Sequence, residues 1–228
     1  MSNPNSVRIN DTNTVRIVST ENFCILGVMV RDAKSAKAQR ESYHHGNLPT
    51  VLTEEAARLL EEKGADGFSL REVARRAGVG VATPSHHFGG ARGLLTAVAT
   101  CGFEKLTAQQ TEAMAAVSDP IARVVVLCQT YVRMGASYPG HAAVMIRWDM
   151  VDGQDKAYSK AASNALELLR SAVAEAAPAY CGSTMVDHAA KTLWATMHGF
   201  VTLSLSEGDI AMERIEFAVR TLITGMRE

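Results

Sequence analysis

The sequence lacks a strong excess of charge and a long apolar run. Its 228 residues carry a formal charge of −1 and 21% charged residues, which excludes an acidic tail or a histone-like polycation. The longest apolar run covers residues 23–30, well short of the roughly 20 residues that span a bilayer. We therefore expect a globular, cytoplasmic protein with no membrane partner.

Cysteines and catalytic motifs are also scarce. The cysteines at positions 24, 101, 128 and 181 form no C-x-x-C pair, which argues against a zinc ribbon and a secreted disulfide framework. The chain has no G-x-x-x-x-G-K-S/T, G-x-S-x-G or H-E-x-x-H motif. Its single E-x-x-H, Glu41 to His44, lacks the second copy that a di-iron bundle needs. We expect no enzyme activity, no cofactor and no metal.

Few segments alternate apolar and polar residues as a strand does, whereas apolar residues recur with helical spacing over most of the chain. Apolar residues recur with helical spacing from Leu48 to Leu60, between a capping Asn47 and a stop at Gly64. Pro49 is tolerated there because it falls in the first turn. The sequence predicts an all-α fold that opens with a helix of about four turns.

Two short helices follow around a glycine turn. Ser69 and Glu72 have the spacing of a capping box, and Gly78 ends the helix after about two turns. A second short helix is expected at 81–88, and a longer one begins near Arg92. This order predicts a helix-turn-helix. Four arginines against one glutamate within 69–92 make it a small basic patch.

The remainder reads as a helical domain. Helices are expected at about 119–138, 141–150, 155–177, 184–205 and 210–226. The last two carry wide apolar stripes, formed by Val186, Ala189, Ala190, Leu193, Met197, Phe200 and Val201, and by Ile215, Ala218, Val219, Leu222, Ile223 and Met226. Such stripes fit a four-helix interface between two copies, or a purely internal role.

These observations divide the chain into four parts. Residues 1–30 are expected to be a disordered or non-native extension, with translation starting at Met29 or Val28. Residues 31–46 form a basic arm, residues 47–106 the helix-turn-helix domain, and residues 107–228 a regulatory and dimerisation domain.

Residues 43–99, with the core S-L-R-E-V-A-R-R-A-G-V and the H-F ending, resemble the DNA-binding domain of TetR-type transcriptional regulators. The stretch LWATMHGF at 193–200 resembles the W-x-x-x-H-G signature of one C-terminal subfamily. The resemblance implies a homodimer that binds a pseudo-palindromic double-stranded DNA operator, usually as a repressor, and is released by a small apolar or amphipathic effector.

The resemblance also assigns residues to DNA. Val81, Ala82, Thr83 and Ser85 would face the major groove, and Ser69 a phosphate. The full set is Tyr43, His44, His45, Ser69, Arg71, Gly80, Val81, Ala82, Thr83, Ser85, His86, His87 and Arg92. One alternative is a metal site at His86 and His87, which is disfavoured because adjacent residues on a helix point in different directions. For His44 and His45 the alternative is a solvated segment that does not contact DNA.

Three positions depart from the family pattern. Ser85 replaces the usual phosphate-contacting Tyr, Gly90 the usual capping Ser, and Ala91 the customary Lys, for which Arg92 is an electrostatic substitute. Pro84 is expected to remove one early hydrogen bond of the recognition helix. We therefore expect weak or salt-sensitive operator binding. The alternative function is a helical interaction protein whose DNA-binding head has degenerated.

Residues 107–228 hold eight of the ten methionines and both tryptophans, which suits a pocket for apolar molecules as well as an ordinary helical core. Trp194 and His198, one turn apart, are the strongest pair. The candidate ligand-binding residues are Tyr131, Met134, Met145, Trp148, Trp194, Met197 and His198.

Overall fold

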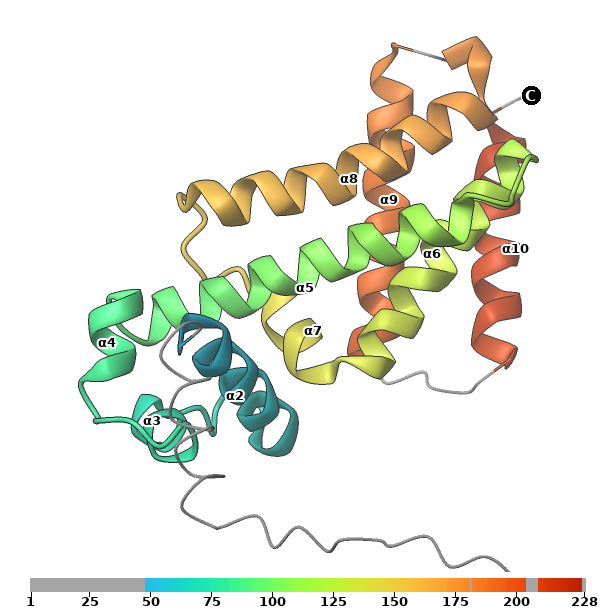
Figure 1. The fold of residues 1–228 in the computed structure, drawn as a ribbon. Helices are drawn as coiled ribbons and strands as arrows, with labels where there is room; N and C mark the ends of the chain where they lie inside the picture. The colour runs from blue at the N-terminus through green and yellow to red at the C-terminus, as the bar shows by residue number, and fades with distance from the viewer. Residues whose placement is uncertain (1–47, 181, 204–208, 227–228) are drawn as a thin grey trace, which may run out of the picture. The chain divides into compact units, whose positions relative to one another are not determined.

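The computed structural model describes residues 48–180, 182–203 and 209–226 (Figure 1). The expected extension, the arm with Tyr43, His44 and His45, and the cap at Asn47 lie outside this range. The described part is helical without strands, so the all-α prediction is confirmed. None of its helices is both long and apolar enough to cross a membrane.

Three helices form the head of the molecule: α2 (Leu48–Lys63), α3 (Leu70–Arg76) and α4 (Thr83–Phe88). Helix α2 ends as predicted at Gly64, whose φ of 67° lets its N–H bond the carbonyl of Leu60 at 2.9 Å. Leu60 is buried on the same face of α2 as Leu52 and Leu59, and the head packs around this face.

The predicted capping box is wrong. Ser69 has the extended backbone of an N-cap, with φ −147° and ψ 121°, but its side chain makes no capping hydrogen bond. The carboxylate of Glu72 accepts hydrogen bonds from the guanidinium groups of Arg75 and Arg76 and not from the backbone N–H of Ser69. Two charge-assisted partners hold a carboxylate more strongly than one backbone N–H does.

The recognition helix begins two residues later than expected, at Thr83. Pro84 therefore lies in the first turn, where its missing N–H forfeits no intrahelical hydrogen bond. The expectation that Pro84 removes one hydrogen bond of the recognition helix is therefore wrong. Gly89, with φ 72°, ends the helix and returns its N–H to the carbonyl of Ser85.

The rest of the described chain forms further helices, most of them close to the predicted ranges. They are α5 (Ala91–Met114), α6 (Pro120–Ser137), α7 (Pro139–Met145), α8 (Lys156–Ala176), α9 (Thr184–Thr202) and α10 (Asp209–Gly225), with a 3₁₀ turn at Pro178–Tyr180. Helix α7 is shorter than its predicted range of 141–150. It tightens where Arg147 N–H bonds the carbonyl of Val144 at 3.2 Å, and residues 146–155 become a connecting segment.

Helix α5 joins the two halves of the molecule, and the expected domain boundary at 106/107 falls inside it (Figure 1). It packs against α2 and α4 near its start and against α6, α7 and α8 along its length. A second junction brings α7 onto α2, where Gly140 lies against the backbone of Ala57. The head is therefore held to the C-terminal helices at two places.

Candidate nucleic-acid interface and ligand pocket

The turn between α3 and α4 presents the start of α4 to solvent. Ala77 and Val79 N–H groups bond the carbonyls of Val73 and Ala74, and Gly78 supplies the left-handed conformation with φ 69°. Val79 is half-buried against the core, whereas the next residues, Gly80 to Ala82, are exposed. The chain thus turns sharply and offers the first turn of α4 outward, as a groove-reading helix requires.

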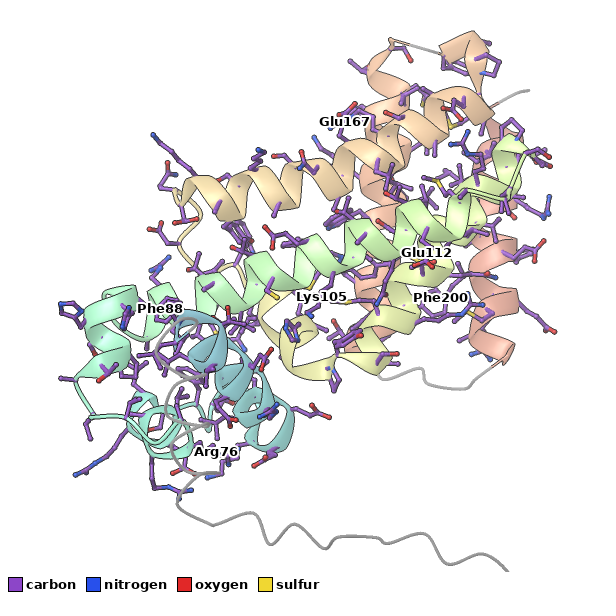
Figure 2. All side chains as sticks on the ribbon, viewed as in Figure 1. Arg76, Phe88, Lys105, Glu112, Glu167 and Phe200 are labelled. Atoms are coloured by element: carbon purple, nitrogen blue, oxygen red, sulfur yellow. The ribbon has the colours of Figure 1, made fainter. Side chains whose placement is uncertain are left out.

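Helix α4 has one inward and one outward face. Pro84 is buried and Phe88, one turn later, packs half-buried against the core (Figure 2). Val81, 58% exposed, lies with Ala82 and Ser85 on the outside, and Thr83 is half-buried. Three of the four predicted groove-facing residues are therefore exposed, and the fourth is partly so.

The two histidines of α4 are also exposed, and their rings meet edge to face at 5.7 Å. In the described ranges, no group of three or more His, Cys, Asp or Glu side chains is arranged to hold a metal ion. His86 and His87 therefore remain predicted contacts to the DNA backbone.

The basic patch has less positive charge free to bind a phosphate than its arginine count indicates, because two of its arginines are paired with carboxylates. Arg75 bonds Glu72 through Nε and Nη2, both at 2.8 Å. Arg76 bridges Glu72 and Glu62, with its Nη2 at 2.6 Å from the Glu62 carboxylate (Figure 2). Bonding by Arg75 and then Arg76 lowers the pKa of Glu72 to about 2, so the pairing persists at neutral pH.

Arg71 remains available for DNA. It is exposed, and no carboxylate pairs with it within the described chain. Ser69 is exposed as well, and its hydroxyl is not used as a cap. Both lie at the N-terminal end of α3, where the backbone N–H groups favour a phosphate.

Arg92 lies beside the head but points to the C-terminal half. Its Nε and Nη2 donate to the carbonyl of Val151 at 3.0 and 2.7 Å. The hydroxyl of Thr96 accepts from the N–H of Asp152 at 2.8 Å and donates to the carbonyl of Arg92. These bonds tie the start of α5, immediately after α4, to the segment between α7 and α8. The predicted phosphate contact of Arg92 stays a prediction.

A cavity of ≈ 370 Å³ lies between α5, the end of α7, α8 and α9. This is the size of sites that hold small molecules. Of the predicted ligand-binding residues, Met145, Trp148, Trp194 and His198 line it. Trp148 stands at its edge and is 82% exposed.

The other predicted ligand-binding residues lie elsewhere. Tyr131, Met134 and Met197 are buried in the core and do not line this cavity. Sequence reasoning missed Phe103, on α5, and Tyr158 and Ser163, on α8. No local signal marks these residues, because the cavity forms where separate helices converge.

His198 has a fixed tautomer. Its Nδ1 is 2.8 Å from the carbonyl of Trp194, which can only accept, so Nδ1 carries the proton. Nε2 is left to accept the hydroxyl proton of Tyr131 at 3.3 Å. Burial lowers the pKa of His198, against the raising effect of its bond to Trp194. The imidazole is therefore neutral at physiological pH.

The apolar stripes of α9 and α10 serve mainly the core of a single chain. Leu193 and Met197 are buried where α9 packs on α6 and α8, and Ile215 and Ile223 are buried where α10 packs on α6 and α9. The outer surface of α10 instead carries Phe217, which is 72% exposed.

Two parts of the chain match known protein families. The family profile "Bacterial regulatory proteins, tetR family" matches residues 52–98, and "Tetracyclin repressor-like, C-terminal domain" matches residues 124–224. No curated protein matches the chain.

Solved structures share the fold. A protein of unknown function from Rhodococcus sp. RHA1 is 34% identical, with 82% of this chain and 98% of the other covered and a TM-score of 0.68. The TetR-family transcriptional regulator PfmR from Thermus thermophilus is 19% identical, with 76% and 97% covered and a TM-score of 0.60. A TetR-family regulator from Bordetella parapertussis is 15% identical, with 76% and 94% covered and a TM-score of 0.61.

Proposed function

The chain belongs to the TetR family of bacterial transcriptional regulators, and from this premise we propose that it is a homodimeric repressor released from its operator by a small apolar or amphipathic effector. As a member of this family it is a DNA-binding regulator and not an enzyme. Its place of action is the cytoplasm, where its operator lies.

The exposed surface of α4 is the proposed reader of the major groove. Val81 and Ala82 offer apolar contact to thymine methyl groups, and Ser85 a single hydrogen bond. Arg71 and Ser69 would hold phosphates beside it. Because Arg75 and Arg76 are already paired with carboxylates, few cations remain for phosphate, which supports the expectation of weak binding.

A dimer is needed to place two recognition helices in successive major grooves, about 34–36 Å apart. An interface at α10 would cover the exposed ring of Phe217, which a single chain leaves open to water. Closed two-fold dimers are the commonest oligomers.

The observation that carries the proposal is the physical link between the cavity and the head. Trp148 lines the cavity, and Val151 and Asp152 follow a few residues later in the same segment. Val151 is bonded to Arg92, and Asp152 is bonded to Thr96, both on α5. A ligand that moves this segment would move the start of α5, which follows α4 directly. To act as an inducer, it must prefer the conformation that does not bind DNA.

Footprinting on the intergenic DNA upstream of the gene tests this function. We expect two protected half-sites related by a two-fold axis, and their loss when a small molecule occupies the cavity. The alternative, a helical interaction protein with a degenerate head, predicts no protection and no dependence of binding on salt.

A further inference from the structure

We propose that the cavity between α5, α7, α8 and α9 takes an uncharged, planar aromatic molecule that carries a hydroxyl or similar polar group. This inference rests on the proposed function and names the chemical class of its effector.

Aromatic rings dominate the cavity walls. Phe103 and Trp194 stack with their centroids 6.0 Å apart and their planes at 21°, and Tyr158 meets the ring of Phe103 at 5.9 Å and 66°. Flat rings in offset and edge-to-face arrangements accommodate another flat ring with the same geometry. The walls therefore suit a planar aromatic guest better than a branched or flexible chain.

Trp148 extends this surface toward solvent. Its indole is 82% exposed and makes no ring contact with any described residue. An exposed tryptophan without a packing partner is informative because this side chain is normally well covered. A planar ligand in the cavity would give the indole a stacking partner.

The cavity wall contains no Asp, Glu, Lys or Arg side chain. An anionic or cationic ligand would lose water there without gaining an opposite charge, which is unfavourable. Because Phe103 and Trp194 turn their faces to each other, they do not form the open aromatic box that holds a quaternary ammonium group. Charge complementarity thus selects a neutral guest.

Two hydroxyl groups can orient such a guest. Tyr158 and Ser163 line the cavity, and neither hydroxyl hydrogen-bonds another residue within the described ranges. Few polar groups on an otherwise apolar wall are typical of sites that fix one ligand orientation. A second cavity, of ≈ 410 Å³ between α6, α7 and α9, has Phe200 as its one aromatic wall residue and serves as a comparison site.

Three probes with one ring system and different charge test the proposal: naphthol, naphthoate and naphthyltrimethylammonium. Binding to the full chain is measured by calorimetry and by tryptophan emission, because both tryptophans of the protein line the cavity. We expect naphthol to bind and change the emission, and the two ionic probes to bind at least ~10-fold more weakly. An ionic probe that binds as tightly as naphthol, or naphthol that leaves the emission unchanged, overturns the proposal.

Two matched substitutions locate the binding. Ala162→Phe fills this cavity and should weaken naphthol binding by at least ~10-fold, whereas Ala143→Phe fills the comparison cavity and should not. Thermal unfolding of each variant checks its folding. If Ala162→Phe does not fold, Ser163→Glu, at an exposed position, should weaken naphthol binding and strengthen that of the ammonium probe. Unchanged probe preference in Ser163→Glu contradicts the proposed site.

Operator binding is measured without any probe, so the two proposals can fail separately. A protein that binds DNA but prefers no neutral probe overturns the ligand class and leaves the repressor standing. A protein that binds naphthol but no DNA supports the ligand class and overturns the repressor.

Discussion

Arg92 donates two hydrogen bonds to the backbone carbonyl of Val151, at 3.0 and 2.7 Å. Arg92 lies in the first turn of α5, directly after the recognition helix and its glycine pair. Val151 is fully buried and follows the turn that lines the aromatic cavity. Arg92 therefore bonds the start of α5, beside the DNA-reading head, to the segment that follows the wall of the proposed ligand site.

Arg92→Met should loosen this junction. Loss of a charged donor leaves the Val151 carbonyl without its partner and should lower the free energy of unfolding by about 1–3 kcal/mol. Amide hydrogen exchange at Asp152 should rise about tenfold, because the neighbouring segment opens more often. Arg147→Met, which removes an exposed pair with Asp149 on the same segment, is the control. Equal exchange in both variants would contradict the junction.

Arg71 and Arg75 should differ in their effect on DNA binding, although they are four residues apart on one helix. Arg71→Ala should reduce the slope of log affinity against log salt concentration by about 0.9, the loss of one phosphate contact. Arg75→Ala should change this slope less, because Glu72 already holds its guanidinium at 2.8 Å. Salt titrations of operator binding measure both, and a larger effect of Arg75→Ala would refute the assignment.

The helix-turn-helix could be predicted from sequence because its signals are local. Gly64, Gly78 and Gly89 each end a helix at the expected place, and each has a positive φ. Which arginines of the head are paired with carboxylates could not be predicted in the same way. Glu62 lies 14 residues before Arg76, on a different helix, and only the packing of α2 on α3 reveals their pairing.

Gly140→Ala should disrupt the second junction between the head and the C-terminal helices. A Cβ at this position would lie 2.0 Å from the carbonyl oxygen of Ala57, which is backbone and cannot rotate away. We expect the free energy of unfolding to fall by about 1–3 kcal/mol, measured by denaturant titration. Gly153→Ala, where an added Cβ meets no atom within 4 Å, is the matched control and should be neutral.

Acid should destabilise the protein through His141. Burial, and secondarily Lys105, lowers the pKa of His141 from 6.5 to about 4. Between these values the unfolded chain binds a proton that the folded chain does not, so stability falls as the pH falls from about 6.5 to 4. His141→Gln should reduce this loss by about 1–2 kcal/mol, after allowance for the partial exposure of the ring. An unchanged pH dependence, matching that of the exposed His188→Gln control, would contradict this cause.

Phe217→Asp should separate the proposed dimer without unfolding its chains. The ring is 72% exposed in the single chain, so the substitution changes the outer surface of α10 and not the core. Sedimentation equilibrium should show a monomer with an unchanged helical spectrum. Val81→Asp, exposed on the DNA-reading helix, should remain dimeric. A dimeric Phe217→Asp protein would move the interface elsewhere.

The ligand site could be predicted only in part. Trp194 and His198 share a helix face, so their spacing identifies them as a pair. Phe103 and Tyr158 come from α5 and α8 and meet only in the folded chain. Methionine content indicated apolar surroundings, but it does not distinguish Met197 from Met145, which is also buried and lines the cavity.

The most direct test of the account is a titration of the purified chain against the DNA upstream of its gene at several salt concentrations. We predict two chains bound per site, with an affinity that falls as salt rises. A chain that stays monomeric and binds no duplex even at low salt would contradict the account.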